Sequence, residues 1–393
     1  MAPPESFQPR PTVVSAPELP AQDFRYLKTE EARREYEKNY VPPNFTLKEL
    51  RDSIPAHLFE RSALKSFMHL FMDFIACGTL YLMSTQLEGK HFLLQLLGWP
   101  VYWFVQGAFF FGIWVIAHEC GHQAFSESRL LNNVVGTILH SALLVPYHAW
   151  RISHSLHHAN TGHVERDQAF VPYRRSEFHK SALYEAVQES PIFILAKMAF
   201  FLVIGWPLYL IMHAGGPSYG KYTSHFHPTS PIFRPNQGNL ILESDAALLV
   251  AIAIIGQCIR VYSFETVGKY YLMPYLFNNA WLVMITYLQH TDVYVPHYEK
   301  STWNYVRGAL TTVDRDFGWF LNHAMNHITD SHVVHHIFSQ IPFYNAIKAT
   351  PYLKEKLGKY YLYDSTPFPV AMYNAISNCN FVDDEGDVLF YRR

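Results

Sequence analysis

The feature that most constrains the fold is a set of apolar stretches long enough to cross a lipid bilayer. The stretch from Phe92 to Ala117 carries no charged residue and leads directly into His118. At about 1.5 Å per helical residue, it exceeds the roughly 30 Å thickness of a hydrocarbon core. Charged residues make up only 16% of the chain, against about a quarter in soluble domains. The sequence therefore predicts an all-α integral membrane protein.

Four transmembrane helices are expected, together with in-plane helices and a cytosolic cap. The predicted spans lie near residues 67–87, 92–117, 191–213 and 246–262. Basic residues concentrate ahead of the first span, so the positive-inside rule places the N-terminus in the cytosol, and four crossings return the C-terminus there. Residues 270–289 are also uncharged, but Pro274, Asn278 and Asn279 suit a lipid-facing helix poorly. We expect that segment to lie in the membrane plane or to be re-entrant.

The rest of the chain divides into two tails and a membrane domain. The first residues are rich in Pro, Ser and Ala, a composition that favours disorder, and they do not resemble a signal peptide. We expect a mostly disordered cytosolic tail over 1–44, the membrane domain over 45–365 and a cytosolic C-terminal tail over 366–393. The net charge of −2 gives no sign of the basic surface that nucleic-acid binding requires.

Histidines form three clusters beside the predicted spans. Eight of the 22 histidines lie in the motifs HECGH at 118–122, HSLHH at 154–158 and HVVHH at 332–336. Residues three and four apart share one face of a helix, so each motif presents its imidazoles together. Eight imidazoles exceed the four ligands of a tetrahedral zinc, and no cysteine joins them. The clusters predict a site for two metal ions, although imidazole alone does not identify the metal.

A metal transporter is the alternative from a different class of protein, since membrane helices and many histidines would also suit zinc transport. Transporters place their ligands near the middle of the membrane on broken helices. Here every cluster lies at or beyond the end of a predicted span. Iron in the purified protein, without metal uptake by vesicles, would separate the two classes.

The sequence around the clusters resembles the membrane fatty acid desaturase family, and in particular its oleate Δ12 branch from fungi and plants. The resemblance is carried by VPYHAWRISHSLHHANTGHVERD at 145–167, LQHTDVYVPHY at 288–298 and RGALTTVDRDFGWFLNHAMNHITDSHVVHHIFSQIPFYNA at 307–346. It implies a non-haem di-iron enzyme that uses O2 and two electrons to remove two hydrogens from adjacent methylenes of an acyl chain. The implied reaction converts oleoyl chains to linoleoyl chains.

The resemblance also implies which side chains bind the two iron ions. The eight clustered histidines match the family's ligands, and His290, after the last apolar segment, matches a ninth. The implied ligands are His118, His122, His154, His157, His158, His290, His332, His335 and His336. Residues expected to orient the ligand rings are Asp167, Asn326 and Asp330, with Glu119 as a further candidate. Gln123 stands where plant members tend to carry another histidine, but the HxxxH pair is intact.

Four residues beside the clusters bear on the product. Ala117, Thr161 and Ser339 match the choices of desaturases, whereas Ile341 stands where desaturases more often carry Met. An acyl 12-hydroxylase therefore stays an alternative. The ω3 branch shares most of the motifs, so a Δ15 or a bifunctional Δ12/Δ15 desaturase stays open as well.

The remaining expectations concern partners and location. The chain carries no HPGG-type haem-binding motif, so we expect electrons from a separate cytochrome b5 and its reductase. The resemblance implies a multi-pass protein of the endoplasmic reticulum membrane, acting on a fatty acyl lipid. Whether the acyl carrier is a phospholipid or coenzyme A stays open.

Overall fold

The computed structural model describes residues 24, 27, 29–178 and 181–393. Of the mostly disordered tail expected over 1–44, residues 1–23 lie outside the described residues, whereas residues 29–44 include the helix α1 (Glu30–Lys38), whose Glu37 pairs with Arg392 at 2.7 Å. The described chain is mostly helical, and it includes four helices long and apolar enough to cross a membrane. They are α3 (Ala63–Thr85), α4 (Phe92–Gly121), α8 (Pro191–Met212) and α9 (Gly238–Tyr262), which η3 (Pro235–Gln237) extends at its start. The predicted fold class of a multi-pass membrane protein is confirmed.

Helix α4 is the most buried of these four helices. It is 61% buried over its most apolar window, whereas α3, α8 and α9 are each 17% buried. Two glycines permit close approach of its neighbours. A Cβ on Gly107 would lie 2.5 Å from Phe277 Cβ, and a Cβ on Gly112 would lie 2.3 Å from Ala324 O. The first contact packs α11 (Met273–His290) against α4, and the second packs α13 (Trp319–Ala324) against α4.

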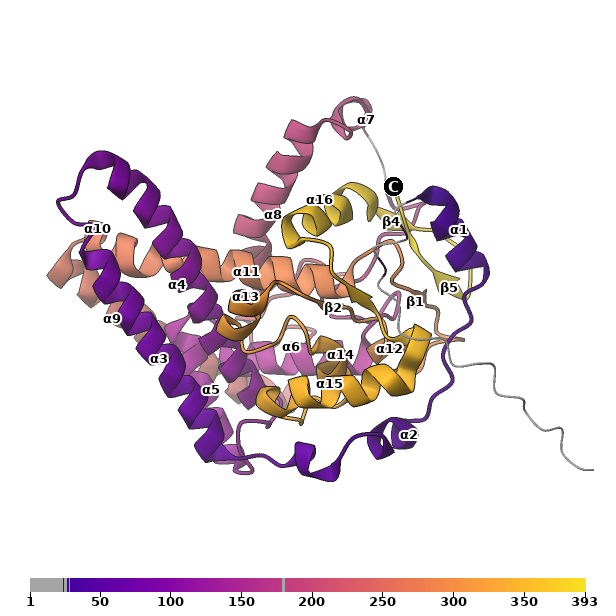
Figure 1. The fold of residues 1–393 in the computed structure, drawn as a ribbon, viewed down its shortest axis with the longest axis horizontal. Helices are drawn as coiled ribbons and strands as arrows, with labels where there is room; N and C mark the ends of the chain where they lie inside the picture. The colour runs from indigo at the N-terminus through magenta and orange to yellow at the C-terminus, as the bar shows by residue number, and fades with distance from the viewer. Residues whose placement is uncertain (1–23, 25–26, 28, 179–180) are drawn as a thin grey trace, which may run out of the picture.

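Helix α11 extends from the turn that joins α3 and α4 to the histidine clusters. It follows α10 (Phe264–Val267) and the π-helical turn η4 (Gly268–Leu272). Lys269 Nζ lies 3.5 Å from Glu88 Oε1 in the α3–α4 turn, and Trp103 Nε1 donates to Lys269 O at 2.9 Å. The helix ends at His290 beside the other clustered histidines, and Figure 1 shows it passing α4 toward the centre of the molecule. Helix α11 therefore runs alongside α4, from the α3–α4 turn to the clustered histidines.

Both ends of α8 contact the part of the molecule that carries the clusters. Near its start, Lys197 Nζ lies 3.4 Å from Ile376 O in α16 (Phe368–Asn378). Just beyond its end, Gly215 O accepts a hydrogen bond from Val171 N at 2.9 Å. Figure 1 shows α8 rising toward α7 (Ala182–Val187), apart from α3, α4 and α9.

Helices α5 (Arg129–Ala142) and α6 (Tyr147–Asn160) follow α4 and are bent by 105° relative to each other. They would count as a fifth candidate crossing only if the bent pair were a single span. Helix α6 carries the second histidine motif, and His148 N at its start donates to Ser244 Oγ in α9 at 2.9 Å. The start of α9 therefore lies on the cluster side of the molecule.

The cap is built from short helices and short strand pairs. Its helices are α1 (Glu30–Lys38), α2 (Leu47–Asp52), η2 (Ala56–Phe59), α12 (Tyr305–Ala309), α13, α14 (His332–Ile337), α15 (Phe343–Leu357), η5 (Gly358–Tyr360) and α16. Its antiparallel pairs are β1 (His297–Tyr298) with β5 (Val388–Leu389), and β4 (Phe381–Val382) with β6 (Tyr391–Arg392). Strand β2 (Asp314–Arg315) pairs in parallel with β3 (Tyr363–Asp364).

Residues 366–393, expected as a tail, differ from that expectation because they fold onto the domain. Helix α16 places Met372, Ala375 and Ile376 in the main apolar core. Strands β4 to β6 then close on each other and on β1. The buried apolar face of α16 is the physical reason for this packing.

Candidate metal centre

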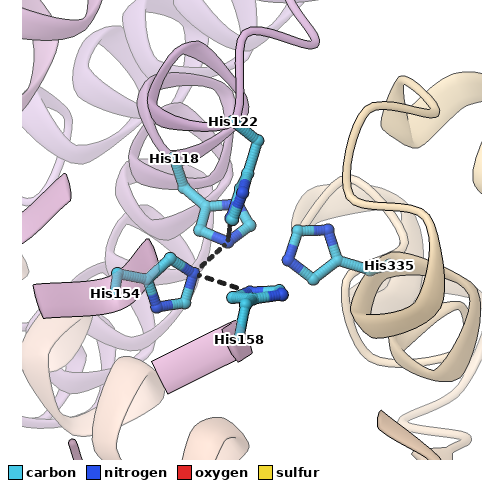
Figure 2. A group of neighbouring side chains, drawn as sticks. All are labelled: His118, His122, His154, His158 and His335. Atoms are coloured by element: carbon cyan, nitrogen blue, oxygen red, sulfur yellow. Dashed lines mark hydrogen bonds between the residues drawn. The ribbon is translucent and has the colours of Figure 1, made fainter. Parts of the chain in front are cut away.

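Five of the predicted ligands converge on one point. The Nε2 atom of His118 lies 2.9 Å from that of His154 and 3.2 Å from that of His122. The Nε2 atoms of His154 and His158 are 3.1 Å apart. His335 completes the set from α14, and one ligand atom of each residue lies within 4.8 Å of all the others. We call these residues the five-histidine group, and Figure 2 shows their rings turned toward a common centre.

The other four predicted ligands form a second group beside the first. Ligand atoms of His157, His290 and His336 lie within 4.8 Å of one another. His332 joins them, because its Nε2 atom lies 3.1 Å from that of His290. We call these four residues the second group. The rings of His158 and His336 stack at 4.0 Å between centroids, so the two groups are in direct contact.

The donor atoms fit metal ions. A metal–nitrogen bond of about 2.0–2.1 Å places neighbouring ligand nitrogens roughly 3.0–3.4 Å apart, and the Nε2 separations above are 2.9 to 3.2 Å. Within the described chain, the Nε2 atoms of His335 and His336 are buried and have no hydrogen-bond partner. Burial lowers the pKa of His332, His335 and His336 well below the usual value. These rings are neutral at pH 7 and offer lone pairs.

Asp167 fixes one ligand of the second group. Its Oδ1 atom lies 2.7 Å from His157 Nδ1 and accepts a hydrogen bond from Ala169 N at 2.9 Å. Burial alone would raise the pKa of this carboxyl, but His157 and the surrounding N–H donors hold it below its usual value. An ionised acceptor on Nδ1 leaves Nε2 of His157 as the metal-binding atom.

Glu119 lies between two ligands of the five-histidine group. Its Oε1 atom is 3.4 Å from His118 Nδ1 and 3.7 Å from His335 Nδ1. Its Oε2 atom accepts a hydrogen bond from Phe343 N at 3.0 Å, which ties the first turn of α15 to α4. The carboxyl group thus faces the outer nitrogens of both rings from slightly beyond hydrogen-bond distance.

Asn326 and Asp330 form their hydrogen bonds elsewhere in the described chain. Asn326 Nδ2 donates to Asp73 Oδ2 at 2.9 Å and to Gly112 O at 3.0 Å. The carboxylate of Asp330 contacts His327 Nδ1 at 3.1 Å and Asn322 Nδ2 at 3.3 Å. Both residues therefore organise the segment before α14, and within the described chain their side chains form no hydrogen bond with the predicted ligands.

The four residues expected to influence the product lie at different depths around the centre. Ala117 is buried in α4 beside His118. Thr161 caps α6, and its Oγ1 atom lies 3.2 Å from His336 Nδ1. Ile341 is 1% exposed and packs in a separate apolar core under α14 and α15, and Ser339 lies half-buried between those helices. Within the described chain, Thr161 is the one of the four whose side chain hydrogen-bonds to the ring of a predicted ligand.

Two residues that the sequence analysis missed hold the ligand-bearing elements. Asp314 accepts hydrogen bonds from Val333 N, at 2.9 Å, and from the Tyr361 hydroxyl, and so fixes α14. Arg315 Nε donates to Leu288 O at 2.8 Å, beside His290, and its guanidinium also pairs with Asp292 and Asp364. The signal available in the sequence was the adjacent charged pair Asp314 and Arg315 between two apolar segments. Charges buried among apolar residues need partners, so the pair indicated residues that hold other elements in place.

Comparison with known proteins agrees with this geometry. The family model described as "Fatty acid desaturase" matches residues 97–368. The chain is 50% identical to the Delta(12) fatty acid desaturases of Mortierella isabellina and Mortierella alpina, over 92% of this chain and 94% of each relative. It is 42% identical to the "Omega-6 fatty acid desaturase, endoplasmic reticulum isozyme 1" of Glycine max, over 88% of this chain and 89% of that protein.

The two adjoining histidine groups of this multi-pass membrane protein are suited to a metal site, and these matches define its class. The chain belongs to the fatty acid desaturase family and is therefore an O2-dependent oxidoreductase. The transporter alternative is set aside by this membership.

Proposed function

We propose that the protein is a Δ12 fatty acyl desaturase that uses two iron ions, O2 and two electrons to convert oleoyl chains to linoleoyl chains. The observation that carries the proposal is the pair of adjoining histidine groups in a chain that is 50% identical to two Delta(12) desaturases. Imidazole and open coordination positions suit iron that reacts with dioxygen. Bound iron would activate O2 for the breaking of unactivated C–H bonds. In the balanced reaction, O2, the two hydrogens removed from the acyl chain, two electrons and two protons give two molecules of water.

The protein's own contribution is to position the ligands and the substrate. Ligands from α4, α6, α11 and α14 leave little freedom for either metal to shift. A methylene is attacked selectively only when it is held within about 3–3.5 Å of the oxidant. The second group is buried, as are His118, His158 and His335 of the five-histidine group, and this burial limits the access of bulk water to the reacting positions.

The position of the new double bond can be tested in a yeast strain that makes oleate but no polyunsaturated acids. We expect a 9,12-diene, located by gas chromatography and mass spectrometry of derivatised lipids. A 9,12,15-triene formed only from added linoleate would favour the ω3 alternative, and both activities together would favour the bifunctional one. A 12-hydroxy acid as the main product would favour the hydroxylase.

Cytochrome b5 and its reductase are the proposed electron donors. Transient redox partners bind through small, largely electrostatic interfaces, so the interaction should weaken as salt rises. Turnover in membranes depleted of cytochrome b5 should fall and should return when the carrier is added back. Undiminished turnover in depleted membranes would contradict this assignment.

For the topology, we propose crossings by α3, α4, α9 and α11, with α8 lying along the cytosolic interface. The support is the contact between Glu88 and Lys269 at one end of α11 and the location of His290 at the other. Both ends of α8 contact the cluster side. Four crossings keep both termini in the cytosol. The soybean relative's name supports the endoplasmic reticulum as the membrane.

Reporter insertions distinguish this topology from the one expected from the sequence. A glycosylation acceptor in a spacer at Gly220 should stay unmodified, and one at Ser263 should be glycosylated. If α8 and α9 crossed instead, the outcomes would be reversed. An acceptor in the α3–α4 turn serves as the positive control for lumenal exposure.

A further inference from the structure

Thr161 stands at the junction of the two ligand-bearing helices α6 and α14. It is the residue directly after α6, and its side chain is 1% exposed. Its hydroxyl donates to His157 O at 2.7 Å and lies 3.2 Å from His336 Nδ1. One hydroxyl thus contacts the backbone of one ligand of the second group and the ring of another.

The direction of these two hydrogen bonds follows from the number of hydrogens. A threonine hydroxyl has one hydrogen, and a peptide carbonyl can only accept. The Thr161 hydrogen therefore points to His157 O, and Thr161 Oγ1 must accept a hydrogen from His336 Nδ1. A neutral imidazole carries one hydrogen, so the Nε2 atom of His336 keeps its lone pair. That Nε2 atom is buried without a hydrogen-bond partner in the described chain.

The backbone around Thr161 is held by close packing, so the hydroxyl has a fixed position. Trp303 Nε1 donates to Thr161 O at 3.0 Å. A Cβ on Gly308 would lie 2.3 Å from the same oxygen. Gly162 has φ +67°, and a Cβ there would lie 2.6 Å from Thr311 Oγ1. Glycine is required at both positions for this approach.

We propose that the Thr161 hydroxyl is a positioning group that fixes the tautomer and the orientation of His336 for metal binding by the second group. The proposal rests on the proposed metal-dependent function and deepens it. It also supplies a physical route by which the residue at position 161 could influence the product. Because the His336 ring stacks on His158 at 4.0 Å, a rotation of His336 would also disturb the five-histidine group.

The substitutions Thr161→Val and Thr161→Ser separate the hydroxyl from the shape of the side chain. Valine keeps the volume and removes the acceptor, whereas serine keeps the hydroxyl. Loss of a residue that orients a metal ligand weakens metal binding by about 10–100-fold. We expect T161V to retain fewer than two irons per chain after dialysis against a weak chelator, measured by mass spectrometry of the metal, and T161S to retain both.

Thr312→Val is the matched control. Thr312 is fully buried, and its hydroxyl donates to Ala309 O at 2.8 Å, so this variant also removes a buried threonine hydroxyl. We expect it to keep both irons. The melting temperatures of the three metal-free variants, measured in parallel, show whether each protein folds.

Several outcomes would overturn the inference. T161V could keep both irons through dialysis, or T161S could lose iron as T161V does, which would assign the effect to packing. T312V could lose as much iron as T161V, which would point to a general effect of lost buried hydroxyls. A wild-type protein that binds no metal at all would contradict the proposed function itself, and so is distinguishable from failure of this inference alone.

Discussion

The five-histidine group and the second group lie side by side, but the surroundings of their outer ring nitrogens differ. In the five-histidine group, the Nδ1 atoms of His118 and His158 are buried without hydrogen-bond partners in the described chain. In the second group, His157 Nδ1 contacts Asp167 and His336 Nδ1 contacts Thr161, and only His332 Nδ1 is buried without a hydrogen-bond partner among the described residues. The group with more ligands has fewer direct supports. Ligand number and ligand orientation are thus two different ways to hold a metal ion.

Removing a ligand from each group is the strongest test of this comparison. His157→Ala leaves three histidines in the second group, and we expect iron to fall to about one per chain. His122→Ala leaves four histidines in the other group and should retain more iron, although both variants should lose desaturase activity. The measurement is metal content of the purified membrane protein. Equal retention in the two variants would remove the proposed difference.

Asp167→Asn is expected to have the next largest effect. An amide oxygen can still accept from His157 Nδ1, but the negative charge that strengthens this hydrogen bond is lost. Iron affinity should fall by about 10–100-fold, measured by competition with a chelator. The same competition with the His157→Ala protein sets the lower limit. Unchanged affinity would mean that the charge of Asp167 is dispensable.

Glu119→Gln should have a smaller effect. The carboxyl group lies 3.4 and 3.7 Å from the two outer ring nitrogens that it faces, which is longer than a good hydrogen bond. We expect iron affinity to fall by less than about tenfold. A loss as large as that of Asp167→Asn would show that the five-histidine group also depends on a carboxyl group.

Asn326→Ala should leave metal binding nearly unchanged. The variant removes two hydrogen bonds and leaves Asp73 buried without that donor, which costs about 1–3 kcal/mol of stability. We therefore expect a lower melting temperature with two irons per chain. If this variant folds but loses iron, the prediction is wrong and Asn326 does help to orient a metal ligand.

The sequence predicts which histidines gather better than it predicts how α8 and α11 pack in the structure. The spacing of each motif fixes which rings share a helical face, because helical geometry is local. The role of residues 270–289 is harder to predict, since Asn278 and Asn279 are unsuited to a lipid-facing helix. In the structure these amides are 0% and 2% exposed, and protein packing shields them. Helix α8 has the composition of a span, and only long-range contacts reveal where its ends lie.

The assignment of supporting residues shows the same limit. Asp167 follows a motif closely, and its bond to His157 joins residues only ten positions apart. Asn326 and Asp330 also stand near a motif, but a strained turn with positive φ at Asn326 and His327 directs their side chains elsewhere. Proximity in the sequence could not distinguish these cases. The partnership of Thr161 with His336 joins residues 175 positions apart and depends entirely on the packing of α6 against α14.

The distribution of ligands over the helices also bears on how the protein is made. Helices α4 and α6 supply His118, His122, His154 and His158, which are translated long before α14. During synthesis on the ribosome, four of the five ligands of the first group are present once residues 1–158 have emerged. The second group draws on α6, α11 and α14. A chain that ends after α11 therefore has one group lacking a single ligand and another with only half of its ligands.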